Sequence, residues 1–238
     1  MRRIWIDREM LYMRDRIKDF TYFNEFLQEE QARITRFSDK LAKGEVKPER
    51  QLPVKTKIHD LKLGMLTAGY SRGDELPVLE SEYAELLKSW KEVWEPDNYN
   101  KNLKMISLGV LFEGDIVLAN EMSAMMKEAN ADDWLLRFLL CSWTGSEMEH
   151  KDGDLIFPTD FSLLQKAVRT HNRREALQEY LSRWYREDCG CYEAHKSSQK
   201  IYYGYWSFEA GAVAKILQID DTGMEQMPYY PYDLVHYK

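Results

Sequence analysis

One carboxylate stands out by its surroundings. Glu209 lies in the stretch YYGYWSFEAGAVAKILQIDD, residues 202–221, where aromatic and very small residues surround it and an acidic pair follows. A carboxylate in such a setting can act as a general base, or it can join neighbouring helices through hydrogen bonds. General base chemistry needs a second catalytic group, and the local sequence supplies none. The pattern therefore favours a structural anchor.

A helical wheel shows where this acid points. With residues 206–219 set at roughly 100° steps, one narrow stripe collects the polar and smallest residues Ser207, Gly211, Lys215 and Gln218. Glu209 falls on the opposite side, beside Ala212 and Val213. This predicts a core helix with one buried or half-buried carboxylate. Because an unpaired buried charge is costly, we expect arginine, tyrosine hydroxyl, tryptophan N–H or helix-start N–H groups as partners.

A second candidate is a metal site. Cys189, Cys191 and His195 follow the pattern C-x-C-x3-H. Zinc sites usually combine two pairs of ligands that lie far apart in the sequence, and this chain has no second pair. An incidental or structural role is favoured, and we expect neither a metal nor another cofactor.

Hydrolase motifs are scarce. The sequence contains no G-x-S-x-G, no P-loop, no dinucleotide glycine fingerprint and no H-E-x-x-H. His59 and Asp60 form an HD pair that resembles a phosphohydrolase fragment, without partner histidines at suitable places. A small helical hydrolase using Glu209, or His59 with Asp60, remains the alternative function.

An acidic loop offers a different kind of site. The segment GSEMEHKDGDL carries four acids against one lysine, namely Glu147, Glu149, Asp152 and Asp154. Such a loop is accessible and can dock a protein, although composition alone favours ordinary solvated structure.

Composition bounds the class of protein. The 238 residues are 44% hydrophobic and 13% aromatic, which predicts a folded chain with a bulky core. The net charge of −7 argues against sequence-independent binding of nucleic acid. It suits either solubility or a basic partner protein, and the total alone does not separate the two. No apolar run approaches the ~20 residues of a membrane span. Three cysteines and the charged first residues favour a cytoplasmic location, and the oligomeric state stays open.

The elements that must position these residues are helices. Apolar residues recur at helical spacing in nearly every segment, whereas alternating β-branched runs are scarce. Helices are predicted over 13–41, 59–70, 78–94, 101–129 with a bend near Gly114, 131–143, 160–168, 174–187 and 206–219. Asn130 and Thr159 are the expected N-caps, and residues 44–56 the expected polar connector. The prediction is an all-α multihelical bundle of about eight to ten helices without a regular repeat. Residues 1–97 and 98–238 are its expected halves, packed as one compact unit.

A family resemblance rests on both ends of the chain. YYGYWSFEAGAVAKILQIDD and YYPYDLVHY, residues 229–237, resemble the C-terminal half of the PoNi-type bacterial immunity proteins. MRDRIKDFTYFNEFL, residues 13–27, looks like the helix that opens their N-terminal half. The matching motif residues are Tyr205, Trp206, Phe208, Glu209, Ala210, Gly211, Lys215, Asp220 and Asp221. Gln218 stands where the family leads us to expect glycine, so the helix is expected to run on to Asp220.

The resemblance implies a function. PoNi proteins are all-α cytoplasmic proteins that bind and neutralise a cognate PoNe-type DNase toxin of the PD-(D/E)xK kind, delivered between bacteria by systems such as type VI secretion. They are not enzymes, and the motif residues are expected to determine the fold. The expected toxin contacts are the acidic residues Glu147, Glu149, Asp152, Asp154, Asp220 and Asp221. The partner is then a protein, with no direct contact to nucleic acid or membrane.

Overall fold

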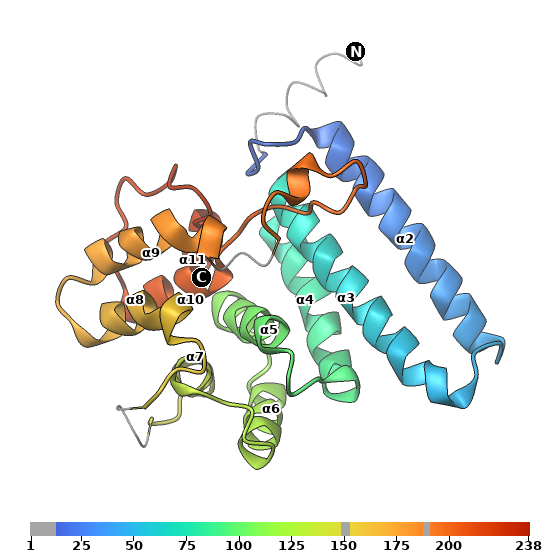
Figure 1. Cartoon of the computed structure of the whole chain (residues 1–238), viewed down its shortest axis with the longest axis horizontal. Helices are drawn as coiled ribbons and strands as arrows, with labels where there is room; N and C mark the ends of the chain where they lie inside the picture. The colour runs from blue at the N-terminus through green and yellow to red at the C-terminus, as the bar shows by residue number, and fades with distance from the viewer. Residues whose placement is uncertain (1–12, 149–152, 188–190) are drawn as a thin grey trace. The chain divides into compact units, whose positions relative to one another are not determined.

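The regular structure is entirely helical wherever the chain is described. The computed structural model describes residues 13–148, 153–187 and 191–238, which hold ten α-helices and two short 3-10 helices (Figure 1). The predicted all-α, multihelical fold is confirmed. The chain forms two compact units, the first made of the described residues up to Trp94 together with Glu193–Gly204. Glu95–Tyr192 and Tyr205–Lys238 form the second unit.

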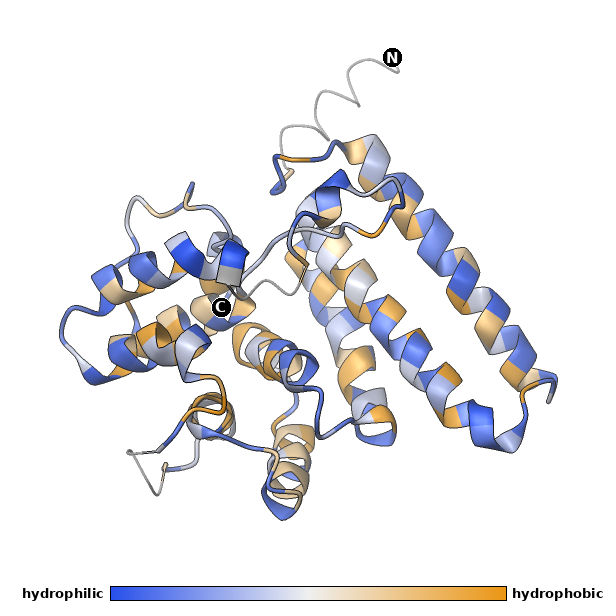
Figure 2. Ribbon diagram, viewed as in Figure 1, coloured by the Kyte–Doolittle hydropathy of each residue, from blue (hydrophilic) through white to orange (hydrophobic). Residues whose placement is uncertain are grey.

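The first unit is a helical hairpin extended by a third helix. Its elements are α2 (Phe20–Ala42), α3 (Pro48–Arg72), α4 (Leu76–Trp90), η1 (Lys91–Val93) and η2 (Ala194–Lys196). Helix α3 packs against both α2 and α4. Figure 2 shows hydrophobic and hydrophilic residues alternating along α2 and α3, as amphipathic helices require. The apolar sides meet in a core that includes Phe23, Leu66, Tyr83 and Trp90.

Two boundaries in this unit differ from the sequence-based expectation. Asp19 caps α2 by accepting a 2.8 Å hydrogen bond from the Tyr22 N–H, so the helix starts at Phe20 and not at Met13. The predicted connector is largely helical, because α3 begins at Pro48, and proline suits the first helical position. Pro53 lies inside α3, near its start, and its missing N–H removes one helical hydrogen bond.

A distant segment completes the first unit. Residues 193–204 return to α2 and α3, where the Tyr22 hydroxyl donates to the Tyr202 carbonyl at 3.0 Å. The Ser71 hydroxyl donates to the Tyr203 carbonyl at 2.8 Å. Lys200 Nζ lies 2.7 Å from a Glu25 carboxylate oxygen and 2.6 Å from one of Glu29. Side chains of the hairpin thus satisfy backbone groups of a segment that carries little helix of its own.

The second unit surrounds one short helix. Its elements are α5 (Tyr99–Phe112), α6 (Ile116–Glu128), α7 (Trp134–Thr144), α8 (Pro158–Arg169), α9 (Arg173–Glu187), α10 (Phe208–Leu217) and α11 (Tyr232–Val235). Helix α10 packs against α5, α7, α8, α9 and α11. This central place agrees with the apolar wheel predicted for residues 206–219.

Local chemistry sets the helix ends here. Glu113 adopts φ +53, which breaks the predicted 101–129 stretch into α5 and α6 close to Gly114. The expected caps Asn130 and Thr159 are wrong. Asp133 directly precedes α7 and accepts a 2.9 Å bond from the Leu136 N–H, and Pro158 opens α8 without a side-chain cap.

Candidate functional site

The Glu209 carboxylate is buried, with an exposed fraction of 7%. Its Oε1 atom accepts hydrogen bonds from the Tyr180 hydroxyl at 2.9 Å, the Trp184 indole N–H at 2.6 Å and the Ser207 hydroxyl at 2.5 Å. Tyr180 and Trp184 lie on α9, whereas Ser207 directly precedes α10. The carboxylate therefore ties α9 to the start of α10. Three neutral donors on one oxygen form an anchor of the kind that the sequence predicts.

The backbone around the anchor is tightly packed. A Cβ atom at Gly211 would lie 2.6 Å from Pro231 Cγ, so only glycine lets α10 approach the start of α11 this closely. The Ser207 N–H donates to the Tyr229 carbonyl at 2.8 Å, and Tyr229 adopts φ +67. The Tyr229 ring stacks on Tyr185 with centroids 5.5 Å apart. The Gly211–Pro231 contact and the Ser207–Tyr229 hydrogen bond join the two motif segments, residues 202–221 and 229–237, and the stack attaches the second segment to α9.

Helix α10 ends earlier than expected. Gln218 adopts φ +49 and ψ +50, and the Ile219 N–H reaches back to the Ala214 carbonyl at 3.0 Å. This is the left-handed helix stop that glycine usually provides, here made by glutamine. The expected continuation to Asp220 is therefore wrong.

The acidic pair after α10 divides into two environments. Asp221 is 4% exposed and accepts hydrogen bonds from the Tyr230 hydroxyl at 2.7 Å and from His236 Nε2 at 3.0 Å. Asp220 is exposed, and hydrogen bonds from Thr222 hold its pKa below the usual value. Asp221 thus holds the C-terminal turn together, while Asp220 presents its charge to solvent.

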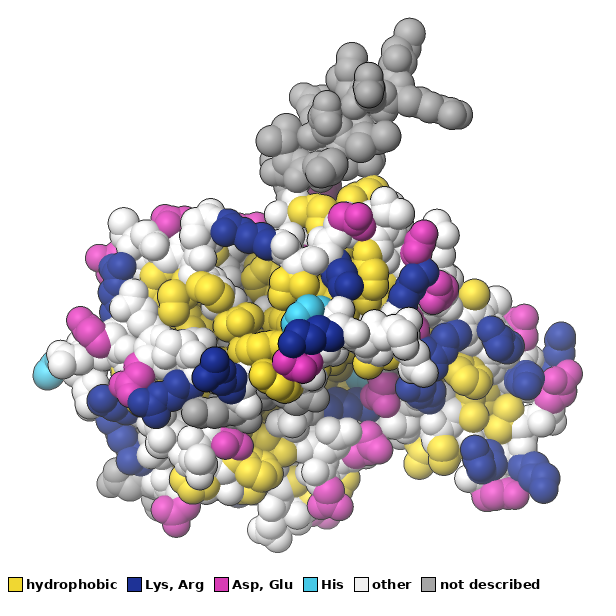
Figure 3. Space-filling view, turned by 45° about the horizontal axis from the view of Figure 1, so that its top comes forward, with side chains coloured by type: hydrophobic (Ala, Val, Ile, Leu, Met, Phe, Trp, Pro, Cys, Tyr) yellow, Lys and Arg dark blue, Asp and Glu magenta, His cyan; other side chains and the backbone are white. Residues whose placement is uncertain are grey.

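The other acidic candidates follow α7 in the sequence. Glu147 and Asp154 are exposed, whereas Glu149 and Asp152 lie outside the described residues. On the face drawn in Figure 3, acidic side chains are scattered among basic ones and do not form one continuous patch. The charge of individual elements therefore says more about where a basic partner could bind than the net charge of the chain does.

The described residues do not bring the proposed metal ligands or the proposed hydrolase residues together into one site. Cys189 lies outside the described residues, and no group of three His, Cys, Asp or Glu side chains suited to a metal occurs among residues 13–148, 153–187 and 191–238. His59 is 2% exposed and its Nε2 lies 3.2 Å from the Leu86 carbonyl, whereas Asp60 is exposed. His59 therefore contacts the backbone of α4 from within the core of the first unit.

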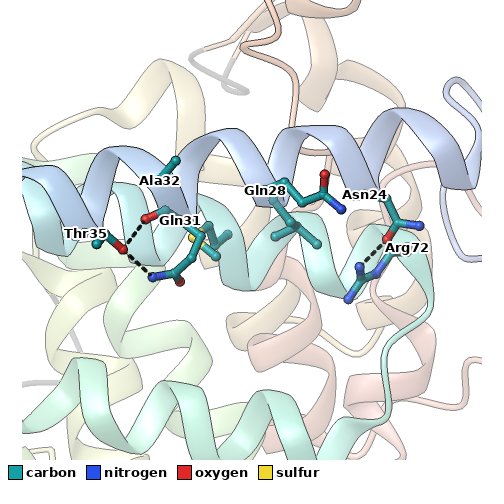
Figure 4. A pocket seen from close by; sticks show the side chains of 8 residues that line it. Asn24, Gln28, Gln31, Ala32, Thr35 and Arg72 are labelled. Atoms are coloured by element: carbon teal, nitrogen blue, oxygen red, sulfur yellow. Dashed lines mark hydrogen bonds between the residues drawn. The ribbon is translucent and has the colours of Figure 1, made fainter.

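An open groove runs between α2 and α3 (Figure 4). It has a volume of about 600 Å³ and is lined by Asn24, Leu27, Gln28, Gln31, Ala32, Thr35, Met65 and Arg72. Arg72 is already held at one end, because it donates to Asn24 and forms an ion pair with Asp74. The sequence patterns described above do not predict this groove. Its signal is the uncharged polar series Asn24, Gln28, Gln31 and Thr35, spaced along one side of a charged helix.

Comparison with known protein families decides the class. Residues 14–120 match the family described as PoNe immunity protein (PoNi), N-terminal, and residues 131–234 match PoNe immunity proteins (PoNi), C-terminal. The chain belongs to the PoNi family. No curated protein and no solved structure matches it.

The two family regions do not coincide with the two compact units. The regions meet between residues 120 and 131, around the end of α6, whereas the chain passes from the first unit to the second between Trp94 and Glu95. The C-terminal PoNi region contains the Glu209 anchor, and its motif residues Tyr205, Phe208, Ala210 and Gly211 are buried. Trp206 and Lys215 are half-buried, and Lys215 Nζ donates to the Leu111 carbonyl at 3.0 Å.

A helix that spans a membrane must be both long and apolar. In the described ranges, no helix combines the length and the apolar character of a bilayer span.

Proposed function

We propose that this protein binds a cognate PoNe DNase toxin in a tight, stoichiometric complex and neutralises it by covering its DNA-binding or active-site face. The carrying observation is the match to both PoNi regions, which together span most of the chain. PoNi proteins are immunity proteins and not an enzyme family. The partner is therefore a protein toxin.

Charge supports the proposed mode of action. A DNase needs a basic surface to bind phosphates, and a binder with a net charge of −7 associates quickly with such a surface through electrostatic steering. Covering that surface excludes DNA both by bulk and by charge. We place the complex in the cytoplasm of the immune bacterium, where it meets a toxin delivered by type VI or similar secretion.

The acidic residues remain the proposed toxin contacts, but they differ in how well each carboxylate can reach a partner. Glu147, Asp154 and Asp220 are exposed and can face a basic partner directly. Asp221 is less suited, because Tyr230 and His236 already occupy its carboxylate. Glu149 and Asp152 belong to the same proposal on sequence grounds alone.

The hydrolase alternative receives less support. Glu209 is buried and its Oε1 accepts three hydrogen bonds, an arrangement suited to holding helices together and poorly suited to taking a proton from a substrate.

Co-expression tests the proposal directly. Bacteria that express a cognate PoNe nuclease should survive only when this chain is co-produced, and the purified proteins should form a one-to-one complex that no longer cleaves DNA. A nuclease of another family, expressed in parallel, serves as the specificity control. Continued DNA cleavage in the presence of excess immunity protein would refute the proposal.

A further inference from the structure

We propose that the outward face of α6, with the turn before it, is a surface on which this protein contacts the basic face of its toxin. This inference rests on the function proposed above and names its contact surface. We call residues Glu113, Asp115, Ile116, Val117, Glu121, Ala124 and Glu128 the α6 surface.

The α6 surface has an apolar centre that the second unit leaves uncovered. Helix α6 buries Ala119, Met122 and Met126 and packs against α7. At its first turn, however, Ile116 is 52% exposed and Val117 is 65% exposed. Two adjacent β-branched side chains in water supply the apolar area that a partner gains by covering.

The spacing of the outward residues makes one continuous stripe. Val117, Glu121, Ala124 and Glu128 follow at intervals of four, three and four residues, which places them on the same side of an α-helix. All four are exposed. The small Ala124 leaves room for a partner to approach the helix backbone between the two carboxylates.

The same surface is strongly acidic. Residues 113–128 contain the exposed acids Glu113, Asp115, Glu121 and Glu128 and the single base Lys127. Lys215 compensates part of this charge, since its Nζ lies 3.2 Å from Glu113 Oε1. An apolar centre with a charged rim is the usual arrangement of a protein–protein interface.

Charge complementarity selects the partner. A second copy of this chain docked on the same face would set acid against acid, and an anionic lipid surface or DNA would be repelled in the same way. A basic protein surface matches both the rim and the apolar centre. Within the proposed function, that partner is the DNA-binding face of the toxin.

Two variants test the two halves of the surface. Ile116→Gln with Val117→Gln removes the apolar centre, and Glu121→Lys with Glu128→Lys reverses the outer charges. Asp115 is kept, because its carboxylate caps α6 through a 2.8 Å bond from the Val117 N–H. Leu52→Gln with Val78→Gln is the matched control, since these side chains are 53% and 50% exposed in the first unit.

Binding is measured against a nuclease-inactivated PoNe domain that the wild type protects against in the co-expression test, after thermal melts show that each variant is folded. We expect the glutamine pair to raise the equilibrium dissociation constant about tenfold or more, mainly through faster dissociation. The lysine pair should slow association several-fold at low salt and flatten its salt dependence. The control should bind like the wild type.

The outcomes separate the surface from the function. If the wild type binds and both α6 variants bind equally well, the α6 surface is excluded while the immunity function stands. If the wild type does not bind, the proposed function fails and this inference fails with it. Loss of a wild-type dimer in the glutamine variant, with toxin affinity unchanged, would assign the surface to a second copy and overturn the inference.

Discussion

The indole N–H of Trp184 donates a 2.6 Å hydrogen bond to Glu209 Oε1, which joins α9 to α10 inside the second unit. Hydrogen bonds to a charged acceptor are shorter and stronger than neutral ones. The same oxygen also binds Tyr180 and Ser207, so the conspicuous acid of this sequence serves as a joint between helices.

Replacing this acid should weaken the fold. Glu209→Gln removes the charge that strengthens three hydrogen bonds and adds an amide group that needs its own acceptor. We expect the free energy of unfolding to fall by about 1–3 kcal/mol, measured by urea denaturation. Glu128→Gln, at an exposed position of the same unit, is the control and should change it little. Equal stability of the two variants would contradict the anchor role.

The helix stop at Gln218 should be open to improvement. The left-handed φ of +49 at Gln218 carries a steric cost in free energy because of the Cβ atom, whereas glycine adopts that conformation without it. After allowing for the greater freedom of glycine in the unfolded chain, Gln218→Gly should raise the free energy of unfolding by about 0.5–1 kcal/mol. Gln226, which is exposed and has no positive φ, is the control, because Gln226→Gly should not stabilise. A lower stability of Gln218→Gly would show that the side chain matters more than its backbone conformation.

Two glycines should respond in opposite ways to alanine. At Gly211 a Cβ atom meets Pro231 Cγ at 2.6 Å, so Gly211→Ala forces α10 and α11 apart and should cost about 1–3 kcal/mol. At Gly64, inside α3, the nearest neighbouring atom is Tyr203 Cδ1 at 3.8 Å. Gly64→Ala should therefore stabilise by about 0.5–1 kcal/mol through helix propensity. Calorimetric melting of both variants checks the pair, and a shift of the same sign in both would refute the packing argument.

The stability contributed by the ion pairs of Lys200 with Glu25 and Glu29 should decrease at alkaline pH. Hydrogen bonds to Glu25 and Glu29 raise the pKa of Lys200, so the folded state binds this proton more tightly than the unfolded state. The resulting stability is present below the ordinary lysine pKa and is lost as the pH rises through the higher folded value. The stability difference between wild type and Lys200→Met should thus be constant near neutral pH and shrink above about pH 10.5.

Hydrogen exchange at neutral pH locates this effect. In Lys200→Met, the amides of residues 199–204 should exchange faster than in the wild type. Lys196→Met removes an ion pair with Glu193 inside the same segment and leaves the attachment to α2 intact. Faster exchange in the Lys196 control alone would contradict the role given to Lys200.

Sequence periodicity predicts much of this fold, because helices bury one side and their apolar spacing records it. The burial of Glu209 follows from its place on the helical wheel. Its partners do not, since Tyr180 and Trp184 belong to a helix whose packing on α10 no local pattern specifies.

Helix ends were harder to predict for a related reason. Asn130 is a good capping residue, yet Asp133 lies where the chain turns into α7. Gln218 makes a glycine-type stop although a residue with a side chain disfavours the left-handed conformation. The predicted acidic contacts and the 1–97 and 98–238 halves remain predictions.

The return of residues 193–204 to the first unit has a consequence for synthesis on the ribosome. Helices α2, α3 and α4 are made before the segment that hydrogen-bonds to Tyr22 and Ser71, which follows only after residues 95–192. A chain that terminates before residue 193 therefore lacks the segment that completes the first unit. The first unit can therefore be completed only after residues 95–192 have been translated.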